Sequence, residues 1–200
     1  MPEVPELRGR PGRSVPRIAL GFAALLLVVS ACGSDSGSDS NTAAVEITGV
    51  ETFDDLDRNH VSGKVDYSHT PTGTRKGTTT RPPVGGDHAA IWQNCGYYPA
   101  PVPNEQGVHS MEHGAVWITY DPALPADQVT VLRGLAGDTH VLVSPFPGLP
   151  SPVVATAWGV QLQLPSADDE RLSQFVTTYR QGPQTPEPGA PCTGAAGDPE

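Results

Sequence analysis

The sequence is poor in basic residues. Its 200 residues include 12 Lys and Arg against 22 Asp and Glu, which gives a net charge of −10 at pH 7. Affinity for nucleic acid and for anionic lipid headgroups depends on Lys and Arg side chains that neutralise phosphates. We therefore expect no nucleic-acid partner.

The chain also lacks a hydrophobic run long enough to span a membrane. The apolar stretch at residues 18–29 has 12 residues, whereas a spanning helix needs about 20. A basic stretch up to Arg17 precedes this run, and the small residues Ser30 and Ala31 follow it. This three-part order is typical of a secretion signal, so we predict that residues 1–31 are a signal peptide outside the fold.

The four residues Val29-Ser30-Ala31-Cys32 resemble the lipobox of bacterial lipoproteins. Cys32 is the predicted lipidation site, whose acyl chains would anchor the protein to the cell membrane on its extracytoplasmic face. An ordinary secretion signal beside a chance cysteine is the alternative. Ser, Gly and Asp dominate the following residues, so we expect a flexible tether over residues 32–43. Removal of residues 1–31 would leave 8 basic and 20 acidic residues, and a net charge of −12.

Cysteine is scarce, and no Cys-x-x-Cys motif is present. With Cys32 lipidated, Cys95 and Cys192 remain as an even pair in an oxidising compartment. We expect a disulfide between them, which would pin the Pro- and Gly-rich tail at residues 181–199 to the domain. Two free thiols with a metal or redox role are the alternative.

Regular structure is expected mainly in the second half of the chain. Pro99, Pro101 and Pro103 argue against a helix or a central strand around them, so we expect regular structure to begin near Val108. Alternating apolar residues predict strands at residues 115–120, 140–143, 153–158 and 159–164. Helical spacing predicts helices at residues 126–135 and 166–179, the second with a variant capping box from Ser166 to Asp169.

These elements predict the α+β fold class for a single domain over residues 44–200. We expect a small, mostly antiparallel sheet covered by two helices, with long irregular loops.

The segment Val108–Gly114 contains the residues best suited to chemistry. His109 and His113 are four residues apart and would share one face of a helix; on a strand, His109, Met111 and His113 would point the same way. The run into Gly114 and the following strand favours the extended alternative. Two imidazoles and a thioether suit copper, so we predict a copper site before a zinc site, with His88 and His60 as further ligands.

Three other interpretations stay open. The histidines could be structural, hydrogen-bonded to backbone carbonyls while Met111 fills a gap. A histidine could act in acid–base catalysis with Glu105 or Glu112, although no nucleophile elbow or phosphate-binding glycine loop is present, so an enzyme is less expected. An acidic surface with exposed Trp92, Tyr97 and Tyr98 would suit a non-catalytic module that contacts an envelope protein or a cell-wall component.

A set of short motifs resembles the family known as domain of unknown function 3105, whose members are exported bacterial, largely actinobacterial, proteins. The matching pieces are His60-Val61, Tyr67, Pro82-Pro83, Gly86, His88, Cys95-Gly96-Tyr97, Pro101-Val102-Pro103, Glu105, Val108-His109, Glu112-His113-Gly114 and Cys192. The resemblance covers most of the predicted domain and implies a lipoprotein address but no reaction. The chain departs from the pattern in a Thr-rich insertion between Tyr67 and Pro82, and in Met111 where Leu is expected. If Leu is common there, a His-based site is favoured over a methionine ligand.

Overall fold

The computed structural model describes residues 46–69 and 81–200. These residues belong to a structural unit from Ala43 to Glu200. The predicted signal peptide, Cys32, the tether at residues 32–43 and most of the Thr-rich insertion lie outside the described residues.

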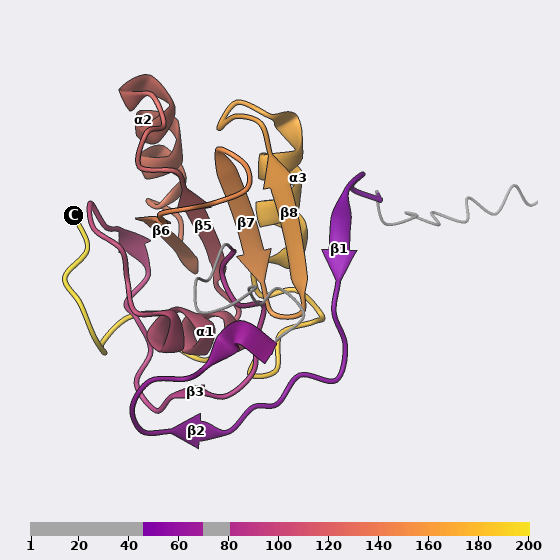
Figure 1. Ribbon diagram of the computed structural model, residues 1–200, viewed down its shortest axis with the longest axis vertical. Helices are drawn as coiled ribbons and strands as arrows, with labels where there is room; N and C mark the ends of the chain where they lie inside the picture. The colour runs from indigo at the N-terminus through magenta and orange to yellow at the C-terminus, as the bar shows by residue number, and fades with distance from the viewer. Residues whose placement is uncertain (1–45, 70–80) are drawn as a thin grey trace, which may run out of the picture. The chain divides into compact units, whose positions relative to one another are not determined.

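A six-stranded sheet with the order β1-β8-β7-β5-β6-β4 forms the centre of the described part of the chain, and β2 and β3 form a separate two-stranded sheet (Figure 1). The strands are β1 (Val50–Thr52), β2 (His60–Val61), β3 (His88–Ala89), β4 (Gly96–Tyr97), β5 (Val116–Tyr120), β6 (Val141–Pro145), β7 (Val153–Ala157) and β8 (Val160–Leu164). The helices are α1 (Asn104–Glu112), α2 (Ala126–Leu135) and α3 (Glu170–Tyr179), with a 3-10 turn at Tyr67–His69.

The main sheet is mixed. Strands β1, β8, β7 and β5 pair antiparallel, whereas β5 pairs parallel with β6, and β6 pairs parallel with β4. Helix α2 carries the chain from the end of β5 back to the start of β6, and such a crossover is what a parallel pair requires. The α+β prediction therefore holds in broad terms, but the expected small sheet is wrong: the sheet has six strands, and it is not purely antiparallel, since two of its pairings are parallel.

Both faces of the sheet are buried, as the alternation along β5 shows. Val116 and Ile118 share a core with Leu132 of α2 and Phe175 of α3. Trp117 points to the opposite face, into a second core that includes residues of α1. The two predicted helices thus cover one face, and a third helix, absent from the prediction, covers the other.

The predicted elements of the second half are present with small shifts at their ends. Helix α2 has the predicted bounds, and the four predicted strands are β5, β6, β7 and β8. Helix α3 starts later than predicted, because Asp169 is its N-cap and its carboxylate accepts a 3.0 Å hydrogen bond from the Arg171 amide. The predicted capping box that started at Ser166 is therefore wrong.

Helix α1 overturns the expectation of irregular and then extended backbone before β5. Its first turn starts directly after Pro103, whose carbonyl accepts hydrogen bonds from the amides of Gln106 (3.1 Å) and Gly107 (3.0 Å). Proline is tolerated at a helix start because the amides there have no partner within the helix. Gly114 then follows the helix with a φ of +93°, a conformation that favours glycine and is common where helices end.

The predicted disulfide between Cys95 and Cys192 is confirmed. The two residues are separated by 97 positions, and their Cα atoms lie 5.4 Å apart. Backbone hydrogen bonds reinforce the link, since the Cys95 amide donates to the Cys192 carbonyl at 2.7 Å and the Asn94 amide donates to Ala196 at 2.8 Å. The tail is therefore joined to the segment that leads into β4.

Gly107 allows α1 to pack directly on the sheet. A Cβ atom at this position would lie 2.7 Å from Cζ3 of Trp117, which is fully buried. We expect Gly107→Ala to lower the free energy of unfolding by about 1–3 kcal/mol through overpacking, although Ala is the better helix former. Gly134→Ala in α2 is the matched control, because no described atom outside the adjacent backbone of α2 lies within 4 Å of its added Cβ. The free energy of unfolding of Gly134→Ala should rise by up to about 1 kcal/mol. Equal changes in the free energy of unfolding for both variants, measured by urea unfolding, would contradict the packing argument.

Candidate metal centre

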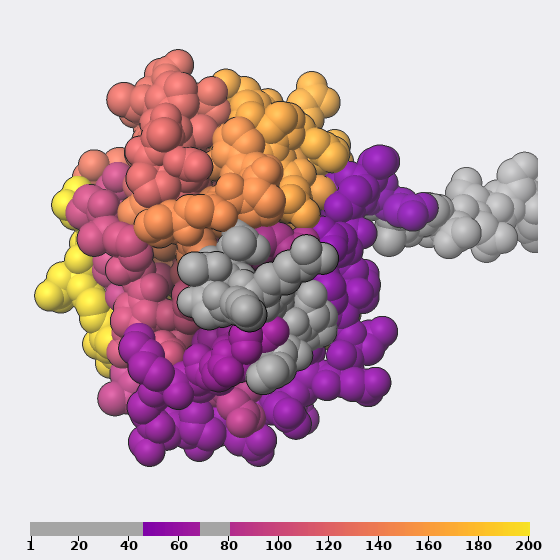
Figure 2. All heavy atoms as spheres, in the orientation of Figure 1, coloured from indigo at the N-terminus to yellow at the C-terminus, as the bar shows by residue number. Residues whose placement is uncertain are grey.

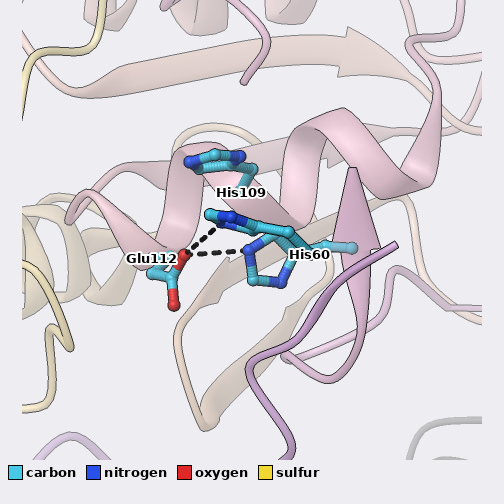
Figure 3. A group of neighbouring side chains, drawn as sticks. His60, His109 and Glu112 are labelled. Atoms are coloured by element: carbon cyan, nitrogen blue, oxygen red, sulfur yellow. Dashed lines mark hydrogen bonds and ion pairs between the residues drawn. The ribbon is translucent and has the colours of Figure 1, made fainter. Parts of the chain in front are cut away.

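Four side chains from three elements converge below the sheet. His60 of β2, His88 of β3, and His109 and Glu112 of α1 each offer one ligand atom, and these atoms all lie within 4.8 Å of one another. The parallel pairing of β2 with β3 places His60 opposite His88. The segments that carry β2, β3 and α1 lie side by side (Figures 1 and 2), and Figure 3 shows His60, His109 and Glu112 directed toward one another. We call these four residues the histidine–glutamate group.

The helical period of α1 determines which of its side chains reach this group. His109, Glu112 and His113 are spaced three and four residues apart and share one face. Met111 is fully buried in the core that contains Trp117 and Leu142. The expected supplementary thioether ligand therefore lies in the core, because the extended backbone that would have aligned Met111 with the histidines is a helix.

Three buried imidazoles are oriented by backbone carbonyls. In each, Nδ1 lies within hydrogen-bond distance of a carbonyl oxygen: His88 with Gly86 at 2.8 Å, His109 with Ala89 at 2.6 Å and His113 with Pro191 at 2.7 Å. A carbonyl can only accept, so each Nδ1 carries the proton, and a neutral imidazole then presents a lone pair at Nε2. Metal-binding histidines in proteins commonly have this arrangement.

The Nε2 atoms face other acceptors. His88 Nε2 lies 2.8 Å from Oε2 of Glu112, and His60 Nε2 lies 3.5 Å from the same oxygen. His113 is outside the histidine–glutamate group, but its Nε2 lies 3.0 Å from Nε2 of His109. Two lone pairs at this distance require a proton or a cation between them. A bound cation would therefore remove the repulsion between these buried lone pairs.

Burial keeps His109 neutral. The residue is 3% exposed, and the pKa of His109 falls from its ordinary value of 6.5 to about 4. Desolvation is the main cause, the neighbouring imidazoles of His113, His88 and His60 act in the same direction, and the hydrogen bond to Ala89 opposes the shift. At neutral pH its Nε2 is therefore available as a ligand.

The group is open to solvent on one side. His88 and Glu112 are buried, but the His60 side chain is 47% exposed. A polar cleft of about 510 Å³ reaches Glu112 between residues 56–59 and the tail at Pro186 and Glu187. Its carboxylates from Asp57, Glu112 and Glu187 outnumber the one guanidinium from Arg58, and a cleft with this charge attracts cations.

Aromatic rings enclose the buried side of the group. The Trp92 ring lies 4.7 Å from the His113 ring and 5.6 Å from the His109 ring, and Trp158 lies 5.9 Å from His88. The Trp92 indole Nε1 is buried and has no hydrogen-bond partner among the described residues. Tyr97 and Tyr98 are 7% and 8% exposed, which corrects the expectation that they are exposed aromatics.

Glu105 has a different role from Glu112, although both are buried on α1. Its carboxylate accepts a 3.0 Å hydrogen bond from the Val65 amide and contacts Lys64 Nζ at 3.4 Å. It therefore attaches the segment after β2 to the helix and is engaged away from the histidines. Acid–base catalysis by a histidine with Glu105 gains no support from these contacts.

From the sequence, Glu112 is expected only as a catalytic partner of a histidine, and the structure adds it to the possible ligands. Glu112 follows His109 by three residues, which is a helical neighbour spacing. That signal was present in the sequence, but it depended on assigning a helix to this segment.

Fold and site together define an α+β protein with a partly buried group of imidazoles and a carboxylate that could hold a metal ion. Residues 60–194 match the family described as "Protein of unknown function (DUF3105)", and the chain belongs to this family. The matched range contains the whole histidine–glutamate group and both cysteines of the disulfide. No curated protein and no solved structure matches the chain. No helix among residues 46–69 and 81–200 is long and apolar enough to cross a membrane.

The pKa of His109 gives a test of its environment without metal. In an NMR titration of the metal-free protein, we expect the His109 ring to stay neutral until the pH approaches 4. Between pH 6.5 and 4 the unfolded chain binds a proton at His109 that the folded chain does not. The contribution of the neutral His109 to the free energy of unfolding is therefore fully present above pH 6.5 and is lost as the pH falls toward 4. A titration midpoint of His109 near 6.5 would show that the ring is hydrated.

Proposed function

We propose that the protein binds a transition-metal ion, copper before zinc, through the histidine–glutamate group with His113 beside it. The observation that carries this proposal is the set of Nε2 lone pairs that buried imidazoles direct at one another and at Glu112. Unless a proton or a cation lies between them, these atoms are acceptors that face acceptors in a desolvated site, which is unfavourable.

The ligand chemistry favours a borderline metal. Imidazole nitrogen and carboxylate oxygen suit Zn²⁺ and Cu²⁺, and the Irving–Williams order places Cu²⁺ above Zn²⁺ at equal availability. The 3.0 Å separation between Nε2 of His109 and Nε2 of His113 is compatible with two neighbouring ligands, each about 2.0–2.1 Å from one ion. The burial of Met111 removes the soft ligand that would have favoured Cu⁺.

The proposal includes the cellular address expected from the sequence. A lipid anchor at Cys32 would hold the acidic domain on the extracytoplasmic face of the cell membrane. There the histidine–glutamate group would meet external metal ions in an oxidising environment, which agrees with the disulfide. The acidic cleft beside Glu112 would then favour entry of a cation.

A module that binds an envelope protein or a cell-wall component is supported less well. The buried Tyr97 and Tyr98 are not available for such a contact. Metal binding also accounts for the converging imidazoles, which an interaction module would not need.

The carboxylates of α1 provide a matched test of the metal centre. We expect Glu112→Gln to weaken Cu²⁺ and Zn²⁺ binding about 10–100-fold, because the amide removes the ligand charge. Glu105→Gln, on the same helix and equally buried, should leave both affinities within about twofold, since its oxygen can still accept from Val65. Isothermal titration of each metal measures the difference. Equal affinities in wild type, Glu112→Gln and His88→Ala/His109→Ala would refute the proposed function.

The lipid anchor is tested separately. We expect Cys32→Ala to abolish incorporation of radiolabelled palmitate and to prevent retention in the membrane fraction by covalent lipid, because no other thiol follows the lipobox closely. Cys95→Ala is the control, and it should keep the label. Equal labelling of wild type and Cys32→Ala would contradict the assignment of Cys32.

A further inference from the structure

The C-terminal tail reaches the metal centre at two points. The Pro191 carbonyl accepts the hydrogen bond from His113 Nδ1 at 2.7 Å, and the Glu187 amide donates to the carbonyl of Glu112 at 3.0 Å. The Glu187 carboxylate also lies 3.5 Å from Nε2 of His113. Residues 187–191 therefore form a strap that orients His113 and borders Glu112.

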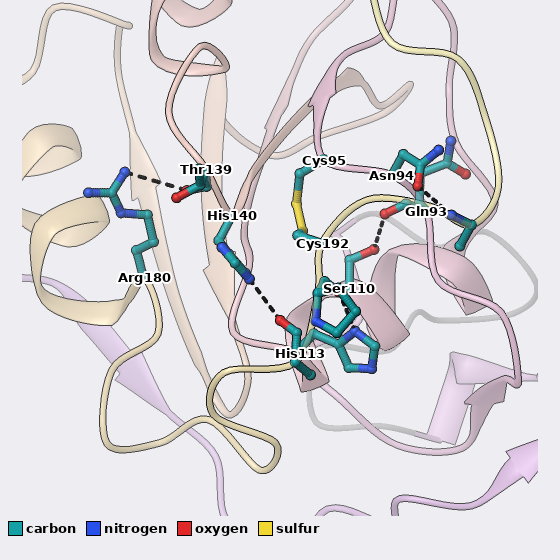
Figure 4. Close-up of a disulfide and its surroundings, with 12 residues drawn as sticks. Gln93, Asn94, Cys95, Ser110, His113, Thr139, His140, Arg180 and Cys192 are labelled. Carbon is teal, nitrogen blue, oxygen red and sulfur yellow. Dashed lines mark hydrogen bonds between the residues drawn. A yellow bond between two sulfur atoms is a disulfide. The ribbon is translucent and has the colours of Figure 1, made fainter.

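One covalent bond holds this strap in place. Cys192 directly follows Pro191, and its disulfide to Cys95 links the strap to the start of β4. Figure 4 shows His113 close to this disulfide. Hydrogen bonds also hold the strap: the Glu187 amide donates to the Glu112 carbonyl at 3.0 Å, the Cys95 amide donates to the Cys192 carbonyl at 2.7 Å, and His140 Nε2 lies 3.0 Å from the Ala190 carbonyl. The disulfide is the covalent restraint next to Pro191, so its loss would loosen the carbonyl that determines the ring orientation of His113.

The disulfide can be approached from solvent. A cavity of about 370 Å³ is lined by Cys95, Cys192 and the segment 136–140. Cys95 is half-buried, whereas Cys192 is 4% exposed. A thiolate entering this cavity would meet Cys95 first.

We propose that the Cys95–Cys192 disulfide regulates the metal affinity of the centre by positioning His113; this inference rests on the proposed function. In the oxidised protein, Pro191 holds the His113 Nε2 beside His109, where it can join the ligands. An external dithiol supplies two electrons and two protons: its thiolate displaces one sulfur, its second thiol resolves the mixed disulfide, and the products are two cysteine thiols and an oxidised dithiol. The released strap then no longer orients His113, and the ion leaves more readily.

A double-mutant cycle tests this coupling with Co²⁺ as the probe and Zn²⁺ as its competitor. All samples are the full chain with Cys32→Ala, which removes the third thiol. The cycle compares the parent, Cys95→Ala/Cys192→Ala, His113→Ala and the combination of the two. We expect the disulfide variant to lose affinity about 10–100-fold, as is usual when an outer partner of a ligand is removed. In the His113→Ala background, the same cysteine replacement should change affinity by less than about threefold.

The visible spectrum of bound Co²⁺ separates positioning from general destabilisation. Loss of the disulfide and loss of His113 should shift the ligand-field bands in the same way, because both remove the same nitrogen. Asn94→Ala is the matched control: it deletes the contacts to Ala195 (2.8 Å) and Gly197 (2.7 Å) beyond Cys192 but keeps the disulfide. Its spectrum and affinity should equal those of the parent.

Reduction of the folded parent protein by a phosphine covers the case in which the cysteine variant fails to fold. We expect Co²⁺ release to precede any loss of near-ultraviolet circular dichroism. Three results would overturn the inference. Co²⁺ could be released only together with unfolding, or its affinity could be equal with and without the disulfide. The cysteine replacement could also reduce the affinity equally with His113 present and with His113→Ala. If the parent protein binds none of Co²⁺, Zn²⁺ and Cu²⁺, the proposed function itself fails, which is a distinct result.

Discussion

The packing of α1 against Trp117 is the contact on which the rest of the metal centre depends. Gly107 brings the helix axis close to the sheet, so that Val108 and Met111 enter the core while His109, Glu112 and His113 point away from it. A helix with a larger residue at position 107 would stand farther from the sheet. The distances from its three polar side chains to His88, to the Ala89 carbonyl and to the Pro191 carbonyl would then change.

The remaining components of the centre come from parts of the chain that are distant in sequence. His60 and His88 are brought together by a two-residue parallel pairing, and Pro191 arrives from the tail through the disulfide. Short strands and loops of this kind have little stability by themselves, since few apolar contacts hold them. The hydrogen bonds from the Nδ1 atoms to backbone carbonyls therefore have two effects. They orient the imidazoles, and those of His109 and His113 attach β3 and the tail to α1.

Much of the sheet was predictable from the sequence, whereas the helix that bears the site was not. Alternation along residues 116–120 and helical spacing at residues 126–135 are strong local signals, and both elements are present. In the sequence, Pro103 argues against a helix and the run into Gly114 favours extended backbone, but these two residues are the boundaries of α1. The mixed order of the sheet could not be derived, because strand pairing depends on contacts between distant residues. The spacing of the histidines indicates a possible site in the sequence. An extended segment, with a side-chain period of 2, would align Met111 with His109 and His113, whereas the helical period of 3.6 aligns Glu112 with them and turns Met111 into the core.

The burial pattern of the centre bears on how it would exchange metal. A structural site is closed, with every ligand enclosed, whereas here His60 is half-exposed and an acidic cleft reaches Glu112. His109 is neutral and need not lose a proton of its own before an ion enters, but a proton held between its Nε2 and that of His113 would have to leave. His113 is the ligand candidate whose orienting carbonyl lies on the tail and not beside β3. A change in the tail would therefore alter the ion's coordination while His88 and His109 keep their places, and this separation would allow one scaffold to bind and to release the same ion.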